Sequence, residues 1–411
     1  MRAGWRELGP GLVTGAADDD PSGIATYSIA GAQFGTGLLW TALATWPLMA
    51  AVQTTCARIG MVTGRGLMSA MRQRFPRWLL VLAALALLVA NTFNLGADLS
   101  GMADAAELLT GVDSHVWIVA FAAGISWATI ELHYAVIAEG LKWLALSLLA
   151  YVVAAVHLRP DWGALLSATV TPSLPRDRAA WGTLVAILGT TISPYLFFWQ
   201  AAQEVEEEKA RGRTSRRARV GASEKEIRDR NVDVGIGSFI SNLVMYSIIV
   251  TTALTLHLKG MTGVQSSAEV ARALEPLAGR FSTLLYTLGI VSTGLLAIPT
   301  LAGSAAYAVA EVFGWREGMD ERPHRAPGFY MVLGLSVATG VALDFANLNP
   351  IRALYLSGVV NGVLAPFMLV AVIVVAADAR IMRGQPSTRF DLALVGFTAA
   401  VMFAAAAGMS L

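Results

Sequence analysis

The chain has 411 residues, of which 55% are hydrophobic and only 14% are charged, and its formal net charge is +1. Soluble globular chains carry about 25% charged residues, so this composition indicates one membrane-embedded bundle and not two or three soluble domains. The near-neutral charge gives no reason to expect a nucleic-acid partner. The single cysteine, Cys56, excludes a disulfide framework and a cysteine-based zinc site.

Eleven apolar segments have about the 20 residues that a membrane-spanning helix needs. In chain order they cover 9–33, 37–60, 79–110, 115–133, 136–157, 178–206, 231–256, 281–313, 328–345, 351–377 and 390–410. We therefore predict an all-α integral membrane protein of about 11 transmembrane helices that forms a single transporter domain over 1–411. No cleavable signal peptide is expected, because the first segment contains three consecutive aspartates.

Lys and Arg residues are concentrated in alternate loops, which indicates an N-terminus on the cytoplasmic side. The longest polar stretch, around 207–227, lies among these positive loops and is expected to be a solvated cytoplasmic loop, with a regulatory or lipid-touching role as the alternative. We expect a multi-pass protein of the cell membrane whose partners are the lipid bilayer and its transported substrate. No cofactor is expected, and a monomer fits the pattern.

The first segment is interrupted in its middle by charge and by proline. Asp18, Asp19 and Asp20 precede Pro21, and each charge inside a membrane costs at least about 2.5–3.5 kcal/mol on insertion scales. Pro21 removes a backbone donor and disfavours helix at the residue before it. The span must therefore unwind, which is tolerated only where the backbone is buried in protein or lines a wet cavity.

The sixth segment has a matching interruption at Pro194, preceded by Thr190, Thr191 and Ser193. Breaks in spans one and six divide ten spans into two sets of five. This is the pattern expected of a transporter with two inverted repeats and its site near the membrane midplane. We predict a LeuT-like 5+5 inverted repeat over about 9–157 and 178–377, followed by an extra helix at 390–410.

Unwound carbonyls and carboxylates form an oxygen cage of the kind that binds Mg²⁺, Ca²⁺ or Mn²⁺. The candidate metal ligands are the carboxylate of Asp20, carbonyls near Ala17 and Ile192, and hydroxyls of Ser22, Thr191 and Ser193. Gly23 and Tyr195 are also assigned to the predicted metal site. Asp19 and Asp18 are weaker candidates, which could instead line the entrance or pair elsewhere. In the tenth segment Asn361 is a candidate outer ligand or gate.

Two other spans carry polar faces. Asn91, Asn94 and Asp98 are spaced i, i+3, i+7 on one helix face, where they could line the ion path or form an interhelical network. Ser238 and Ser241, with the adjacent Asn242, share one face of the seventh segment and are expected to hold helices together.

These residues bring out a family resemblance. The run from Gly9 to Gly23, with Asp20-Pro21-Ser22-Gly23, resembles the first helix of the Nramp (natural resistance-associated macrophage protein) divalent-metal transporters, whose motif is Asp-Pro-Gly-Asn. The run from Gly189 to Tyr195 resembles their sixth helix, whose motif ends in Met-Pro-His. The resemblance implies eleven helices, a cytoplasmic N-terminus, the LeuT-like fold, and Asp20 as the metal-binding aspartate.

The resemblance also has departures. The family's Asn falls on Gly23, its Met on Ser193 and its sixth-helix His on Tyr195, while the tenth-helix Gln falls on Gly358. The acidic pair of the third helix is replaced around Asn91 to Asn94 by amides and apolar residues. This pattern is similar to that of the Nramp-related magnesium transporters.

The resemblance therefore implies transport of hydrated Mg²⁺, with Mn²⁺ as a second cargo, by alternating access and without protons. The alternatives are a proton-coupled Mn²⁺ or Fe²⁺ importer and, disfavoured by the charge of Asp20, a Na⁺-coupled amino-acid symporter. A channel-like or receptor-like protein is a further alternative. The sequence shows no nucleophile–base or metal-hydrolase motif of an enzyme.

Overall fold

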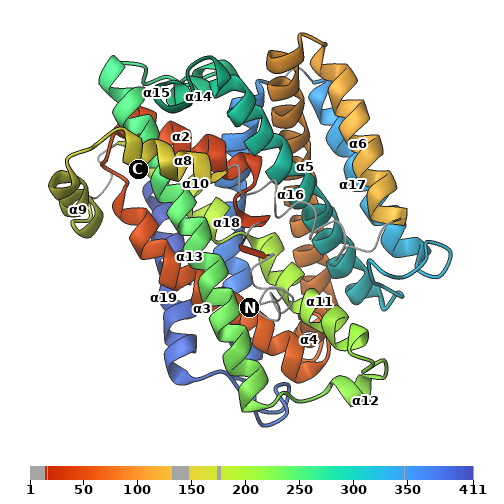
Figure 1. The fold of residues 1–411 in the computed structure, drawn as a ribbon. Helices are drawn as coiled ribbons and strands as arrows, with labels where there is room; N and C mark the ends of the chain where they lie inside the picture. Colours follow the sequence, from red (N-terminus) through yellow and green to blue (C-terminus); the bar gives the residue numbers. More distant parts are fainter. Residues whose placement is uncertain (1–13, 16, 132–147, 174–176, 347, 411) are drawn as a thin grey trace, which may run out of the picture.

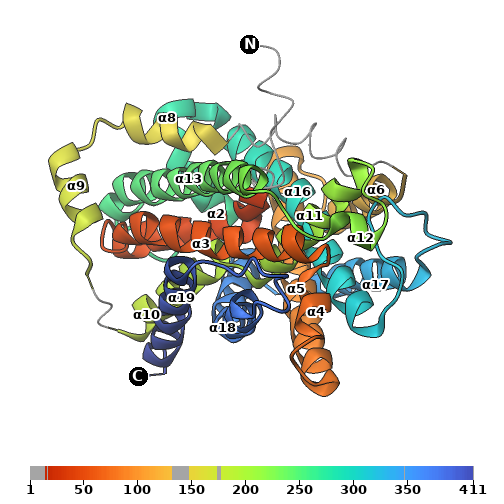
Figure 2. The same ribbon diagram turned by 90° about the horizontal axis from the view of Figure 1, so that it is seen from below.

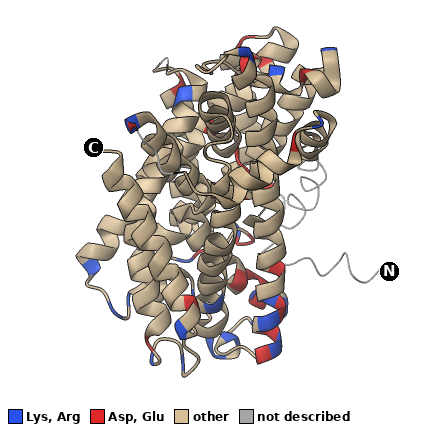
Figure 3. Ribbon diagram, turned by 90° about the vertical axis from the view of Figure 1, so that its left-hand side faces the viewer, with Lys and Arg blue, Asp and Glu red and all other residues tan. Residues whose placement is uncertain are grey.

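The computed structural model describes residues 14–15, 17–131, 148–173, 177–346 and 348–410, and this part of the chain is helical without any strand. The helices pack side by side in one bundle (Figures 1 and 2). Seven helical runs among the described residues are long and apolar enough to cross a membrane. Lys, Arg, Asp and Glu lie mostly towards the two ends of the bundle (Figure 3), as expected for a membrane protein.

The long helices follow the predicted segments to within a few residues, apart from an earlier start of the seventh. The first half holds α2 (Pro21–Phe34), α3 (Trp40–Thr63), α5 (Arg77–Thr110), α6 (Ser114–Glu131) and α8 (Leu149–His157). The second half holds α10 (Arg178–Thr191), α11 (Pro194–Ala210), α13 (Glu224–Thr255), α16 (Ser282–Phe313), α17 (Pro327–Asp344), α18 (Pro350–Ala377) and α19 (Arg389–Gly408). Predicted residues 9–13 and 136–147 lie outside the described residues.

Short helices connect the long ones. They are α4 (Leu67–Met71), α9 (Trp162–Val170), α12 (Arg216–Arg219), α14 (Ser267–Ala271) and α15 (Glu275–Ala278).

Both predicted helix breaks are present. At the first, Asp20 has extended backbone (φ −68°, ψ 169°) and α2 begins at Pro21. At the second, α10 ends before Ile192 (φ −122°, ψ 57°), Ser193 is extended, and α11 begins at Pro194. Proline suits the first helical position because its missing N–H would have no helical acceptor there. The two prolines thus restart each helix at a defined residue.

The two broken spans lie at the centre of the bundle. Helix α2 packs against α13, α18 and α10, while α11 packs against α3 and α16. Glycine also allows α10 and α18 to cross closely. A Cβ on Gly189 of α10 would lie 2.0 Å from the carbonyl oxygen of Gly358 and 2.2 Å from the amide nitrogen of Gly362 on α18. At Gly358 itself a Cβ would lie 3.0 Å from Thr190 Cγ2 and 3.1 Å from the Ala186 carbonyl oxygen, so a side chain there requires small shifts of α10.

The polar stretch at 207–227 is largely exposed, as the composition predicts, but helices extend into it from both sides. Helix α11 continues to Ala210 and α13 begins at Glu224, so only a short connection with α12 remains. Arg230 lies 2.8 Å from Glu204 and also pairs with Glu207, and both Arg230 and Glu204 are buried. Composition alone does not show that opposite charges from two helix ends will pair and become buried.

Candidate metal-transport site

The carboxylate of Asp20 lies at the first break, and four donors surround it. Its Oδ1 accepts hydrogen bonds from Ser22 Oγ (2.6 Å) and the Gly23 amide (2.8 Å). Its Oδ2 accepts longer bonds from Asn94 Nδ2 (3.1 Å) and the Tyr195 hydroxyl (3.4 Å). A carboxylate offers about four lone-pair positions, so a cation that binds Asp20 must displace the weaker donors on Oδ2.

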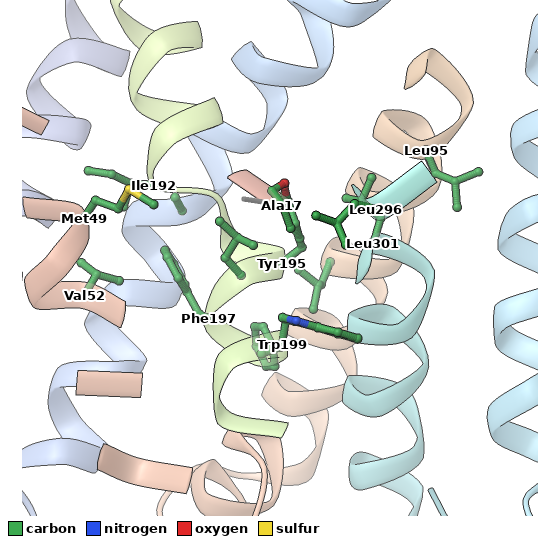
Figure 4. Packing of buried hydrophobic residues seen from close by; sticks show 14 of the residues in the cluster. Ala17, Met49, Val52, Leu95, Ile192, Tyr195, Phe197, Trp199, Leu296 and Leu301 are labelled. Atoms are coloured by element: carbon green, nitrogen blue, oxygen red, sulfur yellow. The ribbon is translucent and has the colours of Figure 1, made fainter. Parts of the chain in front are cut away.

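Tyr195 connects the two breaks. Its hydroxyl lies 2.9 Å from the carbonyl oxygen of Ala17 and 3.4 Å from Asp20 Oδ2, and Figure 4 shows Ala17 and Tyr195 close together among buried apolar side chains. A phenol has one proton, so the shorter bond to Ala17 is the stronger of the two. Tyr195 therefore fastens the start of α11 to the unwound part of the first span.

Helix α5 contributes two polar side chains beside Asp20. Asn94 donates to Asp20 through its nitrogen, while its Oδ1 is buried and has no hydrogen-bond partner among the described residues. Asp98, one turn further, is fully buried and interacts electrostatically with Asp20. The Ser22 amide interacts electrostatically with Asp98, and within the described residues neither Asp98 oxygen accepts a regular hydrogen bond. Three oxygens on one helix face thus remain available to a ligand.

The predicted polar stripe on this helix divides into two parts. Asn91 donates to the Leu301 carbonyl at 3.0 Å and to Ser304 Oγ at 2.8 Å, which ties α5 to α16. Asn94 and Asp98 instead face the first break. Asn91 therefore forms an interhelical contact, and lining of the ion path stays a prediction for Asn94 and Asp98.

The other two aspartates of the first break face α13. Ser241 Oγ lies 2.7 Å from Asp18 Oδ2 and 3.2 Å from Asp19 Oδ1. Asp18 is 0% exposed and Asp19 is 3% exposed, so neither lines an open entrance in this arrangement.

The remaining predicted ligands are buried at or near the second break. Thr191 Oγ1 donates to the Ile187 carbonyl at 2.8 Å, and Ser193 Oγ donates to the Gly189 carbonyl at 2.6 Å. These hydroxyl protons are committed to the helix, although the oxygens can still accept. Ile192 is buried between them. Asn361 of α18 is buried, and neither of its amide atoms has a hydrogen-bond partner in the described part of the chain.

The site concentrates negative charge without balancing it. Asp18, Asp19, Asp20 and Asp98 are all at most 3% exposed. Across the described residues none of them forms an ion pair with Lys, Arg or His. Buried charges are usually paired or coordinate a metal, and the donors present are all hard oxygens. The arrangement fits a divalent cation.

Two features were underestimated from the sequence. The sequence placed Asp98 on a polar face of the third helix but did not single it out as an acid beside Asp20. The i, i+4 spacing from Asn94 was the available signal, but it could not show which face meets the first break. Met102 of α5 and Pro21 both contact the position of a Cβ on Gly294, so a thioether also lies near the break.

Known proteins share this architecture. The family model described as "Natural resistance-associated macrophage protein-like" (Nramp) matches residues 11–411. The divalent metal cation transporter MntH of Deinococcus radiodurans is 27% identical over 98% of this chain and 88% of its own length, and that of Burkholderia ambifaria is 26% identical over 96% and 86%.

Solved structures give the same fold. A manganese transporter of Eremococcus coleocola aligns with TM-score 0.75 and 17% identity, covering 99% of this chain and 87% of its own. Mhp1, a nucleobase-cation-symport-1 family transporter, aligns with TM-score 0.56 and 14% identity, covering 97% and 90%.

The fold and site thus define a multi-pass, all-α membrane protein with the LeuT-like arrangement of transporters. The chain belongs to the Nramp family of divalent-metal transporters. It is a transport protein and not an enzyme.

Proposed function

We propose that this chain carries a divalent metal cation across the cell membrane, and that its main cargo is hydrated Mg²⁺, moved without protons. The observation that carries the proposal is a set of buried oxygens beside the Asp20 carboxylate that have no hydrogen-bond partner in the described part of the chain: Asn94 Oδ1 and both oxygens of Asp98. Mg²⁺ dehydrates reluctantly, and proteins bind it through one or two carboxylates while it keeps several waters. Asp20 and Asp98 supply two carboxylates.

The other predicted site residues take supporting roles in this proposal. Ser22 and Gly23 orient Asp20 through the hydrogen bonds to its Oδ1. The cation would also meet carbonyl or hydroxyl oxygens of Ala17, Thr191, Ile192 and Ser193, with Asn361 as an outer ligand, as the broken helices move. Tyr195 acts as a latch: when no cation is bound, its hydroxyl holds the two breaks together through its contacts with the Ala17 carbonyl and Asp20 Oδ2.

Ser193 supports transport of a hard cation such as Mg²⁺. Where the sixth-helix motif of the Nramp family has a Met thioether, this chain has the Ser193 hydroxyl, and soft ligands such as a thioether favour transition metals over Mg²⁺. A smaller side chain also leaves more room for a partly hydrated ion once the helices move. A membrane potential of about 100 mV supplies about 4.6 kcal/mol for two charges, so inward movement of Mg²⁺ needs no second ion.

The packing supports alternating access by two inverted repeats, about 9–157 and 178–377, with 390–410 outside them. Helix α3 packs on α11 in the way that α13 packs on α2, and α5 packs on α6 in the way that α16 packs on α17. These pairs exchange under the symmetry that relates spans one to five with spans six to ten. We propose that α2, α10 and α11 rock against α5 and α16, with the N-terminus cytoplasmic.

The main alternative is proton-coupled import of Mn²⁺. Two observations favour it: the relatives include manganese transporters by name, and Asp98 is a buried acid beside Asp20 that could take a proton. In that case Asp98 would exchange protons and not hold the cargo.

Uptake into proteoliposomes separates the two functions. With ⁵⁴Mn²⁺ as tracer and a pH dye inside, the proposal predicts that millimolar Mg²⁺ suppresses uptake and that the lumen does not acidify. Asp98→Asn should weaken the apparent Mg²⁺ affinity by at least about tenfold, the scale of 1.4 kcal/mol. The same change at the partly exposed Asp104 of α5 is the matched control. If ⁵⁴Mn²⁺ uptake is unchanged by millimolar Mg²⁺ and the lumen acidifies, the magnesium function is excluded.

A further inference from the structure

A second group of buried oxygens lies on the N-terminal side of the first break, between the residues that precede Asp20 and helix α13. We call it the α13 acid cluster: Asp18, Asp19, Ser238 and Ser241. Ser241 Oγ lies within hydrogen-bonding distance of both Asp18 Oδ2 (2.7 Å) and Asp19 Oδ1 (3.2 Å). A hydroxyl has a single proton, so it satisfies only one of these carboxylates at a time.

Two further oxygens in the cluster have no hydrogen-bond partner among the residues that the structure describes. They are Asp18 Oδ1 and Ser238 Oγ, whose residues are 0% and 1% exposed. Ser238 lies one turn before Ser241 on the same face of α13. A Cβ on Gly15 would lie only 2.6 Å from the Gly237 backbone, which places this turn of α13 directly against the segment that carries the aspartates.

Asp20 provides the internal comparison. Among the described residues that carboxylate has four donors, whereas Ser241 is the one residue whose side chain donates to Asp18 or Asp19. A purely structural cluster would be expected to complete its hydrogen bonds, because an unsatisfied buried polar group costs about 1–3 kcal/mol and a charged one more. Two adjacent carboxylates and two hydroxyls, without a described Lys, Arg or His paired to them, instead suit a hard cation.

We propose that Asp18, Asp19, Ser238 and Ser241 form a second binding site for Mg²⁺, next to the one at Asp20. In its choice of ion this inference rests on the proposed function. The site lies on the N-terminal side of the break, and the adjacent carboxylates would hold the cation together with the two hydroxyl oxygens and retained waters. Neighbouring sites for like charges weaken each other's hold, which helps an ion to leave a multi-site pathway. The second site thus serves as the next position of the ion on its path.

Equilibrium binding of Mg²⁺ to the full chain in nanodiscs tests the inference. The wild type should bind two ions, and both the Asp18→Asn/Asp19→Asn double variant and the Asp20→Asn variant should bind one. Ser241→Ala keeps both carboxylates and should weaken the second site by about 10–100-fold, as loss of a supporting hydrogen bond does at metal sites. Ser247→Ala, on the same helix with its hydroxyl bonded to the Leu243 carbonyl, is the matched control and should leave both sites unchanged.

The outcomes separate this inference from the proposed function. One bound ion in the wild type, lost in Asp20→Asn and kept in the double variant, would overturn the second site and leave the Asp20 site standing. Two ions in the wild type that both persist in the double variant would also overturn it. If the wild type binds no Mg²⁺, both the inference and the magnesium function fail. Should the double variant not fold, the Ser241→Ala affinity decides: an unchanged second affinity refutes the proposal.

Discussion

Tyr195→Phe tests the idea that Tyr195 latches the two breaks when no cation is bound. The substitution removes one hydroxyl, and with it the 2.9 Å bond to the Ala17 carbonyl and the 3.4 Å contact with Asp20 Oδ2. Loss of a partner for a buried carbonyl costs about 1–3 kcal/mol. Only the cation-free arrangement, in which Tyr195 contacts Ala17 and Asp20, bears this cost. In the cation-bound arrangement the donors on Asp20 Oδ2 have already moved away.

The expected result is tighter Mg²⁺ binding. In the cation-free arrangement Tyr195 occupies Asp20 Oδ2, so the more this arrangement is populated, the weaker the apparent affinity for Mg²⁺. Destabilising it by about 1–3 kcal/mol therefore lowers the Kd of Mg²⁺ by up to about 5- to 140-fold. Calorimetry on the purified protein measures this directly. The control is Tyr286→Phe on α16, whose buried hydroxyl donates to Ser267 Oγ at 3.2 Å away from the site; its Kd should stay within about twofold of wild type.

The sign of the shift decides the role of Tyr195. If Tyr195 were itself a ligand of the cation, its loss would weaken binding. A raised Kd in Tyr195→Phe would therefore refute the latch, and an unchanged Kd would show that the cation-free arrangement does not compete with the cation.

Three other predictions concern selectivity and stability. Ser193→Met places a thioether at the second break and should shift the preference from Mg²⁺ towards Mn²⁺ by about tenfold in competition uptake; an unchanged ratio would remove Ser193 from the selectivity argument. Gly189→Ala overpacks the crossing of α10 and α18 by about 1–3 kcal/mol and should lower the melting temperature, whereas Gly124→Ala on α6, where a Cβ meets nothing within 4 Å, should not. Arg230→Ala leaves buried carboxylates unpaired at a cost of about 3–5 kcal/mol, and Arg211→Ala at a half-exposed pair should cost at most about 1 kcal/mol; equal melting temperatures would contradict the buried network.

Much of the fold was accessible from the sequence because membrane helices are marked by composition and by their breaks. Helices α2 and α11 begin at Pro21 and Pro194, at the predicted breaks. Proline fixes φ near its helical value and lacks the backbone N–H, whatever its surroundings. Helix existence and both breaks follow from local chemistry alone.

The site was only partly accessible. Asp20 was identifiable because a carboxylate in mid-span is costly and rarely without function. Asp98 was visible only as one member of a polar face, and which of its neighbours meets the first break depends on the rotation of α5 against α2. The pairing of Ser241 with Asp18 and Asp19 likewise depends on contacts between residues more than 200 positions apart, which a single sequence does not encode in any local pattern.

The buried network at Arg230 illustrates a third limit. A run rich in Glu, Lys and Arg is typical of a solvated loop, and most of 207–227 is exposed as that rule predicts. Just outside this range, Glu204 of α11 and Arg230 of α13 neutralise one another and are buried. Net composition cannot distinguish a solvated set of charges from a paired one.

The central claim is that Asp20, at the paired helix break, holds the transported divalent cation. Uptake of Mg²⁺ into proteoliposomes that contain wild type or Asp20→Asn, matched for protein amount and melting temperature, tests it most directly. The account predicts saturable uptake by the wild type and none above empty liposomes for Asp20→Asn. Uptake by a folded Asp20→Asn protein at the wild-type rate would contradict it.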